Sequence, residues 1–454
     1  MKRIIKNGTV VTASETYEAD VLVEDGVISA VGRGLNAPDA IDASGLLVLP
    51  GAIDVHTHME MLAGGLCSAD DFYTGTVAAA CGGTTTILDF VEPAQGQRLL
   101  DVLAARMAEA GPKAVVDYSF HMTINRADSA TLDEMGAVVD EGLPSFKAYM
   151  AYAGLMLDDE ALYRVLVRSR EIGARVSVHA ENGGLIRYLI AKHVAEGKSA
   201  PIWHARSHPA EMEAEATSRA MDLAHLAKAP LYVVHVSAAV ALARIRAAQI
   251  LHWPVFAETC PQYLVLDESR YEEPGLEGAK YVVSPPLRTT GDQDAMWEGL
   301  RDGAVHTVAT DHCPYNFHGQ KDRGRDSFAA IPNGTGGVET RLPLLYHHGV
   351  NAGRLTLNRF VELVSTAPAR LFGLDGRKGS LEPGCDADIV LWDPQREVTI
   401  TAANLHQNVD YTPYEGFAVR GWPVLTMLRG QVIVRDGCFL GAKGMGRFLK
   451  RGAD

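Results

Sequence analysis

The residues best suited to chemistry begin with two histidines, His56 and His58, at the end of a short apolar run. On a strand, side chains two positions apart point to the same face, so these two imidazoles can act together. Imidazole nitrogens are common ligands of transition metals, and a pair at a strand end could begin such a site. Solvated or packed histidines also occur in this spacing by chance. The interpretation therefore depends on whether the chain supplies further ligands.

Other apolar segments also end in groups that can bind a metal or exchange a proton. Such segments end near His179, His235 and Asp311, and another contains Lys147. Taken singly, a histidine can be a packed core residue, and an aspartate can cap the next helix. Together, at the same ends of neighbouring strands, these side chains predict one polar site.

Lys147 lies in the apolar run Ser145–Tyr149, where an unpaired ammonium group would be costly. Two explanations remain open from the residues alone. The side chain extends its charge to solvent or pairs with Asp311. Alternatively, Lys147 is chemically modified.

These groups can meet only if a regular fold positions them. The pattern of residues 51–374 predicts such a fold. Short apolar strands alternate there with amphipathic segments, as in successive β-α units. Strands are expected at 52–58, 85–90, 115–121, 145–149, 175–179, 231–235, 255–259 and 306–310, and helices at 70–81, 99–110, 160–172, 211–227 and 239–250. Eight units in about 320 residues predict an α/β fold, a (β/α)8 TIM barrel with its active site at the carboxyl ends of the strands. A doubly wound open sheet is the alternative, and the absence of a Gly-x-Gly-x-x-Gly motif after the first strand disfavours it.

Both ends of the chain have the composition of β-strands. Residues 1–50 contain β-branched runs between turn signals, which is too little chain for a sheet with its own core. Similar runs return in 375–454, so the two ends are expected to form one small discontinuous β-sandwich domain. Residues 441–454 are expected to form a surface arm or a subunit contact.

Composition disfavours several classes of function. The chain has 454 residues, 47% of them hydrophobic, and a formal net charge of −14. An acidic chain argues against a nucleic-acid partner, and no apolar run reaches the ~18 residues needed to span a membrane. The six cysteines are scattered without a Cys-x-x-Cys pair, and the N-terminus has no apolar signal-peptide core. These features predict a reduced, cytoplasmic protein.

Over nearly its whole length the sequence resembles the dihydropyrimidinase and D-hydantoinase family of the amidohydrolase superfamily. The motifs that carry the resemblance are HTHMEM (56–61), ADDFYTGT (69–76), GGTTT (82–86), FKAYMAY (146–152), HAEN (179–182), YVVSPPLR (281–288), DHCP (311–314), GQK (319–321), IPNG (331–334) and GRFLK (446–450). The resemblance implies an enzyme that hydrolyses cyclic amides, namely 5-substituted hydantoins or 5,6-dihydropyrimidines, to N-carbamoyl amino acids. It also implies a homotetramer.

The resemblance implies two divalent metal ions in each subunit. His56, His58 and Asp311 would bind the first ion, and His179 and His235 would bind the second. Neutral imidazoles with anionic ligands suit Zn²⁺, although Mn²⁺ or Co²⁺ could substitute.

The remaining roles are also implied by the resemblance. Lys147 would react with CO2 to give N6-carboxylysine, whose two carbamate oxygens would bridge the ions. A water shared by the ions would attack the ring carbonyl, and Asp311 would move its proton to the leaving nitrogen. Tyr152 would donate a hydrogen bond to the developing oxyanion, and main-chain groups of Ser284 and Asn333 would orient the substrate.

The residues expected around the ring substituent depart from the usual pattern of the family. They are Met61, Leu62, Ala63, Tyr149 and Met156. Ala63 is smaller than the bulky apolar residue often found there. We expect a roomy apolar pocket that favours 5-substituted hydantoins.

Other members of the superfamily give alternatives. An allantoinase would use the same ligands, although the stretch from Lys147 to Tyr152 favours a hydantoinase. A dihydroorotase should have an arginine shortly after the two histidines, and none follows His58. Some relatives keep the fold as oligomeric scaffolds after losing metal ligands, whereas all six ligand positions are occupied here.

Overall fold

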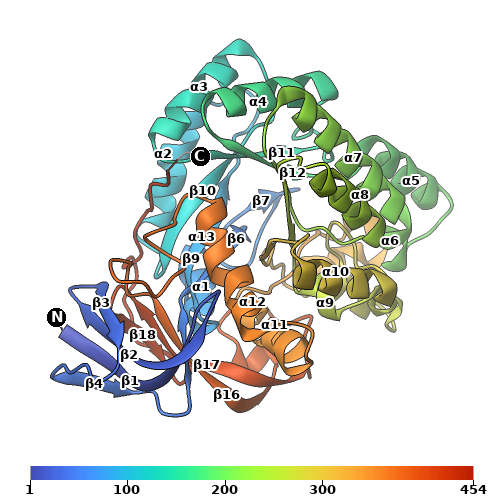
Figure 1. Ribbon diagram of the computed structural model, residues 1–454. Helices are drawn as coiled ribbons and strands as arrows, with labels where there is room; N and C mark the ends of the chain where they lie inside the picture. Colours follow the sequence, from blue (N-terminus) through green and yellow to red (C-terminus); the bar gives the residue numbers. More distant parts are fainter. Residues whose placement is uncertain (1, 453–454) are drawn as a thin grey trace.

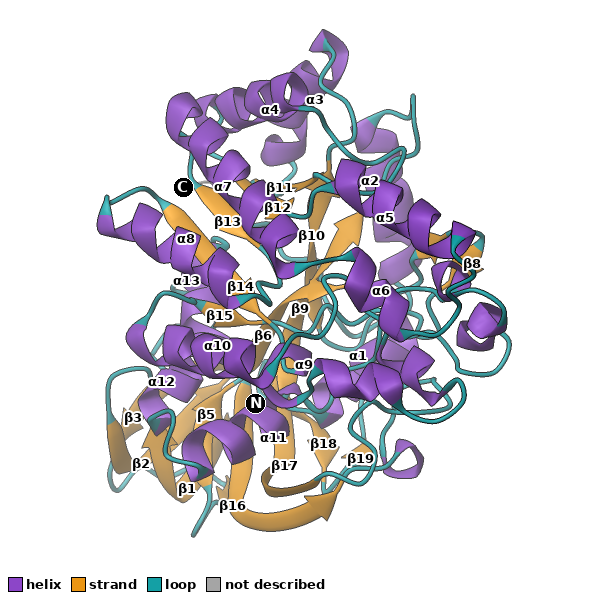
Figure 2. Cartoon of the chain, turned by 90° about the vertical axis from the view of Figure 1, so that its right-hand side faces the viewer, coloured by secondary structure: helices purple, strands orange, loops and turns teal. Residues whose placement is uncertain are grey.

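Eight parallel strands form a nearly closed barrel, which confirms the predicted fold class. The computed structural model describes residues 2–452. Figure 2 shows these strands at the centre of the molecule with helices around them. In chain order, which is also their order around the barrel, they are β6 (Ala52–Thr57), β9 (Thr84–Val91), β10 (Asp117–Thr123), β11 (Ser145–Tyr149), β12 (Arg175–His179), β13 (Leu231–Val233), β14 (Val255–Thr259) and β15 (Thr307–Val308).

Side-chain capping begins several of the helices. The Asp71 side chain accepts hydrogen bonds from the N–H groups of Tyr73 and Thr74 and so begins the first helix. The helices are α1 (Phe72–Cys81), α2 (Leu99–Ala110), α3 (Ser129–Asp140), α4 (Asp159–Glu171), α5 (Gly183–Ala195), α6 (Ile202–Ser207), α7 (Ala210–Ala227), α8 (Ala239–Ile250), α9 (Gln262–Val265), α10 (Thr290–Asp302), α11 (Arg341–Leu345), α12 (Leu357–Val361) and α13 (Ala367–Leu371). Across residues 2–452, no helix combines the length and apolar character needed to cross a membrane.

Two barrel strands end two residues earlier than expected from the sequence. The sixth ends at Val233 instead of 235, and the eighth at Val308 instead of 310. The physical reason lies in the backbone just beyond them, because His235 and Asp311 adopt left-handed φ angles of 40° and 53°. A left-handed residue turns the chain out of the strand ladder.

The first and last barrel strands are joined mainly by side chains. The Arg341 guanidinium donates hydrogen bonds to the carbonyl of Ile53 at 2.9 Å and to that of Val308 at 2.8 Å. Asp54 accepts from the Thr310 N–H at 3.2 Å and from its hydroxyl at 2.7 Å. Arg341 and Asp54 are both fully buried, with Nε and Oδ2 3.8 Å apart. We call this group, Asp54, Thr310 and Arg341, the barrel seam.

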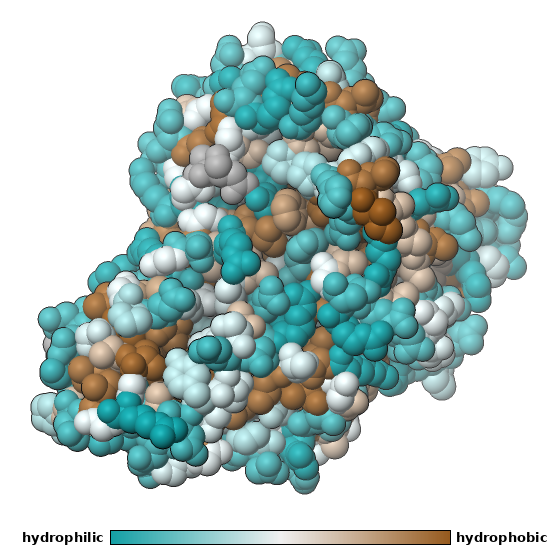
Figure 3. All heavy atoms as spheres, in the orientation of Figure 1, coloured by the Kyte–Doolittle hydropathy of each residue, from teal (hydrophilic) through white to brown (hydrophobic). Residues whose placement is uncertain are grey.

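The two ends of the chain combine in one continuous sheet, as the sequence predicts. Its strands lie in the order β19 (Cys438–Phe439), β18 (Gln431–Arg435), β17 (Ala418–Leu428), β16 (Ile389–Thr399), β5 (Leu47–Pro50), β1 (Lys2–Val11), β2 (Thr16–Glu24) and β3 (Val27–Gly32), with β4 (Asp39–Asp42) paired to β1. Strand β5 pairs with β16, so the ends of the chain meet at the middle of this sheet. Apolar side chains from both ends, including Val21 and Leu425, form a core of their own. On the outer surface, brown patches in Figure 3 mark apolar side chains over these strands, at lower left.

The C-terminal segment packs on the barrel instead of extending from the surface. It runs from the small sheet back to the barrel, as the red trace in Figure 1 shows. The Leu449 N–H donates to the Tyr118 carbonyl at 2.7 Å, and Arg451 Nε donates to the Ser119 hydroxyl at 2.9 Å. Both Leu449 and Arg451 are buried. Residues 1, 453 and 454, which the sequence placed in the small domain and its arm, lie outside the described residues.

Replacing Arg341 with methionine tests the barrel seam. The Arg341→Met variant leaves the Asp54 carboxylate buried without its cation, so we expect the free energy of unfolding to fall by about 3–5 kcal/mol. Urea unfolding followed by circular dichroism measures it. In the control, Arg246→Met removes a partly exposed ion pair with Asp302 and should change stability by less than about 1 kcal/mol. Equal losses in the two variants would contradict the role of the seam.

Candidate active site

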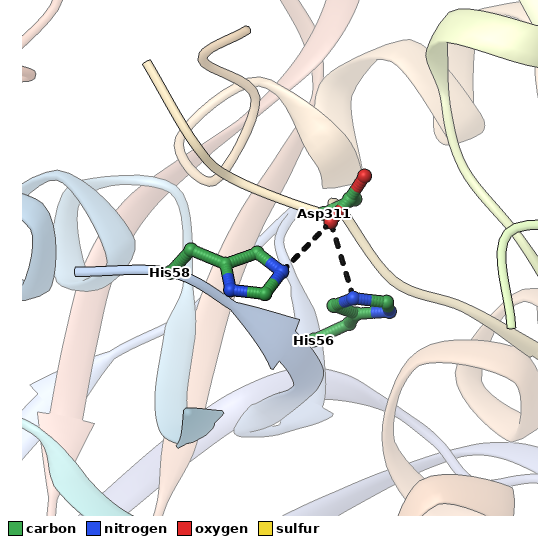
Figure 4. A group of neighbouring side chains, drawn as sticks. All are labelled: His56, His58 and Asp311. Carbon is green, nitrogen blue, oxygen red and sulfur yellow. Dashed lines mark ion pairs between the residues drawn. The ribbon is translucent and has the colours of Figure 1, made fainter. Parts of the chain in front are cut away.

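Three ligand atoms converge at the mouth of the barrel. His56 Nε2 and His58 Nε2 each lie 3.1 Å from Asp311 Oδ1. Figure 4 shows both imidazoles pointing at this carboxylate. Metal bonds of 2.0–2.1 Å in a tetrahedral site separate neighbouring ligand atoms by about 3.3 Å. The three residues could therefore hold a metal ion.

A second pair of histidines faces this group. His179 Nδ1 and His235 Nε2 are 2.9 Å apart, and both side chains are buried. The rings of His56 and His235 are 5.5 Å apart between their centroids, so the two groups are neighbours. The structure thus brings together five residues that the sequence places at the ends of four strands.

Two buried carboxylates hold the far nitrogens of these histidines. Glu258 Oε1 lies 2.7 Å from His56 Nδ1, and Glu181 Oε2 lies 2.9 Å from His179 Nε2. Burial disfavours the ionised form of Glu181, but His208 and His179 outweigh it and hold its pKa well below the ordinary value. Such carboxylates orient a metal-binding imidazole and raise its basicity.

Neither Glu181 nor Glu258 was predicted as a site residue. Each has a recognisable signal in the sequence. Glu258 is a carboxylate inside the apolar strand β14, and Glu181 follows His179 at a spacing of two.

Lys147 is buried on β11 among aromatic rings. Its Nζ lies 5.2 Å from the ring centroids of Phe90 and Tyr149. Burial lowers the Lys147 pKa to about 8, although the carboxylates of Asp311 and Glu258 act in the opposite direction. Within residues 2–452 Lys147 forms no ion pair with Asp311, whose Oδ1 faces the histidines instead. Part of the Lys147 amine is therefore unprotonated near neutral pH.

The three residues expected to contact the substrate lie together. The Tyr152 hydroxyl forms hydrogen bonds with the side chains of Ser284 and Asn333. Asn333 Nδ2 in turn donates to Ser284 Oγ at 3.0 Å. The Tyr152 ring centroid is 5.0 Å from that of His179, so this group borders the second histidine pair. Burial raises the Tyr152 pKa, which keeps the hydroxyl protonated at neutral pH.

Strained backbone occurs at three of these positions. Tyr152, His235 and Asp311 have left-handed φ angles of 70°, 40° and 53° without being glycines. Such conformations cost about 1–3 kcal/mol each and persist where surrounding contacts fix them. The fold therefore holds these side chains in place against a local preference for other conformations.

The expected substituent residues fall into two groups. A cavity of about 340 Å³ borders His58, and Met61 and Leu62 line it. Tyr149 and Met156 do not line this cavity and instead pair with each other through a backbone bridge. Leu62 and Ala63 are exposed on the hairpin of β7 (Leu62–Ala63) and β8 (Leu66–Cys67). The rest of the lining is more charged than the sequence predicts and includes Glu60, Asp89, Glu92, Arg106 and Glu109.

A second cluster of potential ligands lies elsewhere. Cys81, Glu339 and His406 have ligand atoms within 4.8 Å of one another. Both carboxylate oxygens of Glu339 already accept hydrogen bonds from His406, each at 2.7 Å. This cluster is therefore explained as an ion pair between the buried Glu339 and the exposed His406, beside a packed thiol.

Comparison with known proteins places the chain among hydrolases. The model of the amidohydrolase family matches residues 47–433. A D-hydantoinase of Geobacillus stearothermophilus is 48% identical over 455 residues, which cover 99% of this chain and 97% of that protein. A D-phenylhydantoinase of Escherichia coli K12 is 46% identical over 456 residues, or 99% of this chain and 98% of that protein. The crystal structure of the dihydropyrimidinase from Brevibacillus agri matches with a TM-score of 0.99 at 49% identity, covering 100% of this chain and 99% of that one. The chain belongs to the amidohydrolase family, whose members depend on metal ions.

Proposed function

We propose that this protein is a cyclic amidohydrolase that opens 5-substituted hydantoins or 5,6-dihydropyrimidines to N-carbamoyl amino acids. The observation that carries the proposal is the contact of Tyr152 with Ser284 and Asn333 beside the histidine cluster. This arrangement offers donors for a cyclic amide next to a metal-binding group. The relatives named as hydantoinases and dihydropyrimidinase support the same reaction.

The donor set fits two divalent ions. His56, His58 and Asp311 would hold the first, and His179 and His235 would hold the second, in agreement with their ligand-atom separations of 2.9–3.1 Å. Zinc suits these ligands best, with manganese or cobalt as substitutes. When bound, the ions acidify a shared water and polarise the substrate carbonyl.

Lys147 would be the bridging residue in this site. An unprotonated amine is needed to react with CO2, and burial lowers the Lys147 pKa toward that state. The product, N6-carboxylysine, would share one negative charge between two carbamate oxygens, both of which could serve as metal ligands. Carboxylation also removes the cost of an unpaired buried ammonium group.

The protein's own groups would move the proton and orient the ring. Burial opposes ionisation of Asp311, yet His56 and His58 hold its pKa well below the ordinary value, so its carboxylate is free to accept a proton. The proton would pass from the attacking water to Asp311, and from Asp311 to the ring nitrogen as the C–N bond breaks. The Tyr152 hydroxyl would donate to the carbonyl oxygen as negative charge develops there.

We further propose that residues 51–374 form the catalytic barrel and that 1–50 with 375–454 form the small domain. We also propose that the protein is a homotetramer and lies in the cytoplasm. All six cysteines have free thiols, in agreement with a reducing compartment. Light scattering on the purified protein measures the assembly.

A substrate panel tests the reaction. With zinc-loaded enzyme, we expect kcat/KM for 5-phenylhydantoin to exceed that for hydantoin by at least about tenfold, because the added ring contributes apolar contacts. Initial rates are measured on both hydantoins, dihydrouracil, allantoin and dihydroorotate. A preference for allantoin would favour an allantoinase. If metal-loaded protein hydrolyses none of them, the scaffold alternative is favoured.

Two substitutions separate side-chain from main-chain contacts. Tyr152→Phe removes the oxyanion donor and should lower kcat by about 10²–10³-fold. Ser284→Ala keeps its main-chain groups and should lower kcat by less than about tenfold. Steady-state kinetics on 5-phenylhydantoin measure both. Equal losses in the two variants would contradict the main-chain assignment at Ser284.

Metal content tests the bridging lysine. We expect the wild type to bind two zinc ions per chain in bicarbonate buffer, and Lys147→Met to bind fewer and to lose hydrolysis, because the carbamate is absent. Plasma emission spectrometry measures the zinc. As the control, Lys113→Met removes a partly exposed lysine paired with Glu60 and should keep both ions. Two ions and full activity in Lys147→Met would disprove the role of Lys147.

A further inference from the structure

Lys321 is a buried lysine that no step of the proposed reaction uses. It begins the short helix η3 (Lys321–Arg325), and its side chain is fully buried. Its Nζ donates to the carbonyl of Val282 at 2.8 Å and to the carbonyl of Pro332 at 3.0 Å. These two carbonyls belong to the segments that carry Ser284 and Asn333.

The Pro332 carbonyl shares a peptide unit with the Asn333 N–H. A trans peptide is planar, and its C=O and N–H groups point in opposite directions. When Lys321 holds the carbonyl, it also fixes the direction of the Asn333 N–H. Within residues 2–452 this N–H donates no hydrogen bond, so it is available to a ligand.

His204 holds the peptide unit of the Ser284 N–H in the same way. His204 lies on α6, is 4% exposed, and places Nε2 2.8 Å from the Val283 carbonyl. This carbonyl shares a peptide unit with the Ser284 N–H, which likewise has no acceptor among the described residues. Burial lowers the His204 pKa to about 3, so the ring is neutral and Nε2–H is the donor to the carbonyl.

A buried N–H without a partner normally calls for an explanation, because such groups are rare in folded proteins. Here the two N–H groups without a partner belong to the buried Ser284 and the partly buried Asn333, whose side chains are hydrogen-bonded to each other and to Tyr152. In each case a buried side chain donates to the carbonyl at the other edge of the same peptide unit. The same arrangement at both peptides indicates that both serve the same role.

We infer that Lys321 and His204 are positioning residues, each holding one peptide plane so that the N–H groups of Asn333 and Ser284 face the substrate. This inference rests on the proposed function, since it specifies how that site binds a cyclic amide. The amide oxygens of the ring are acceptors that match two fixed donors. Lys321 and His204 themselves do not touch the substrate.

The lysine acts here through its N–H hydrogens. An amine or an ammonium group has at least two, enough for both carbonyls. The glutamine amide also has two N–H hydrogens, whereas methionine has a similar size and no donor. The two variants Lys321→Gln and Lys321→Met therefore differ in the property at issue.

The test compares these variants on 5-phenylhydantoin. We expect Lys321→Met to raise KM about tenfold, the equivalent of one weakened hydrogen bond, while kcat stays within about threefold. Lys321→Gln should recover most of the loss. Titration calorimetry with the product N-carbamoylphenylglycine should show the same order of affinity without turnover, and zinc content should not change.

Lys378→Met is the matched control. Lys378 is equally buried, but it pairs with Asp117 and Asp388. Its loss should lower stability and leave KM unchanged. If Lys321→Met does not fold, His204→Phe provides the same test at the Ser284 peptide.

A folded Lys321→Met protein with wild-type KM and product affinity overturns the inference, as does equal KM in the Met and Gln variants. Failure of the proposed function looks different, because the wild type would then hydrolyse none of the cyclic amides.

Discussion

The candidate site depends on closing the barrel between its first and last strands. Both strands are short at this point, and β15 contributes only Thr307 and Val308 to the ladder. Main-chain pairing between these two segments begins only beyond β15, where the His58 N–H donates to the His312 carbonyl at 2.8 Å, and the fully buried side chains of Arg341 and Asp54 join the strands before that point. Asp54 also holds the N–H and hydroxyl of Thr310, the residue before Asp311. The same contacts that close the barrel therefore bring Asp311 to His56 and His58.

Around the site, several of the groups are held in place by buried groups behind them. Glu258 and Glu181 hold two of the histidines. The seam holds Asp311, and Lys321 fixes the peptide plane before Asn333. Buried polar groups are expensive unless each has its partners, so such an arrangement specifies one geometry. This rigidity lets strained positions such as Tyr152 persist.

The sequence predicts the barrel strands that carry this site more fully than the buried groups that hold its side chains in place. Every barrel strand lies within two residues of its expected bounds, because buried parallel strands are short apolar runs with clear ends. Polar residues at those ends can be expected to meet, since all eight ends lie at one face. The seam and Lys321 were not predicted. Arg341 and Lys321 donate to carbonyl groups far away in the chain, and main-chain acceptors leave no residue pattern to read.

The small sheet has a consequence for the order of folding. Strand β5 lies between β1 and β16, so its outer edge has no partner until residues 389–399 have been made. On the ribosome, the N-terminal strands therefore emerge long before their sheet can be completed. Pairing across such a distance is slow, and an open edge strand can pair with other chains. The barrel sequence between the two halves therefore sets how long the edge of β5 stays open during synthesis.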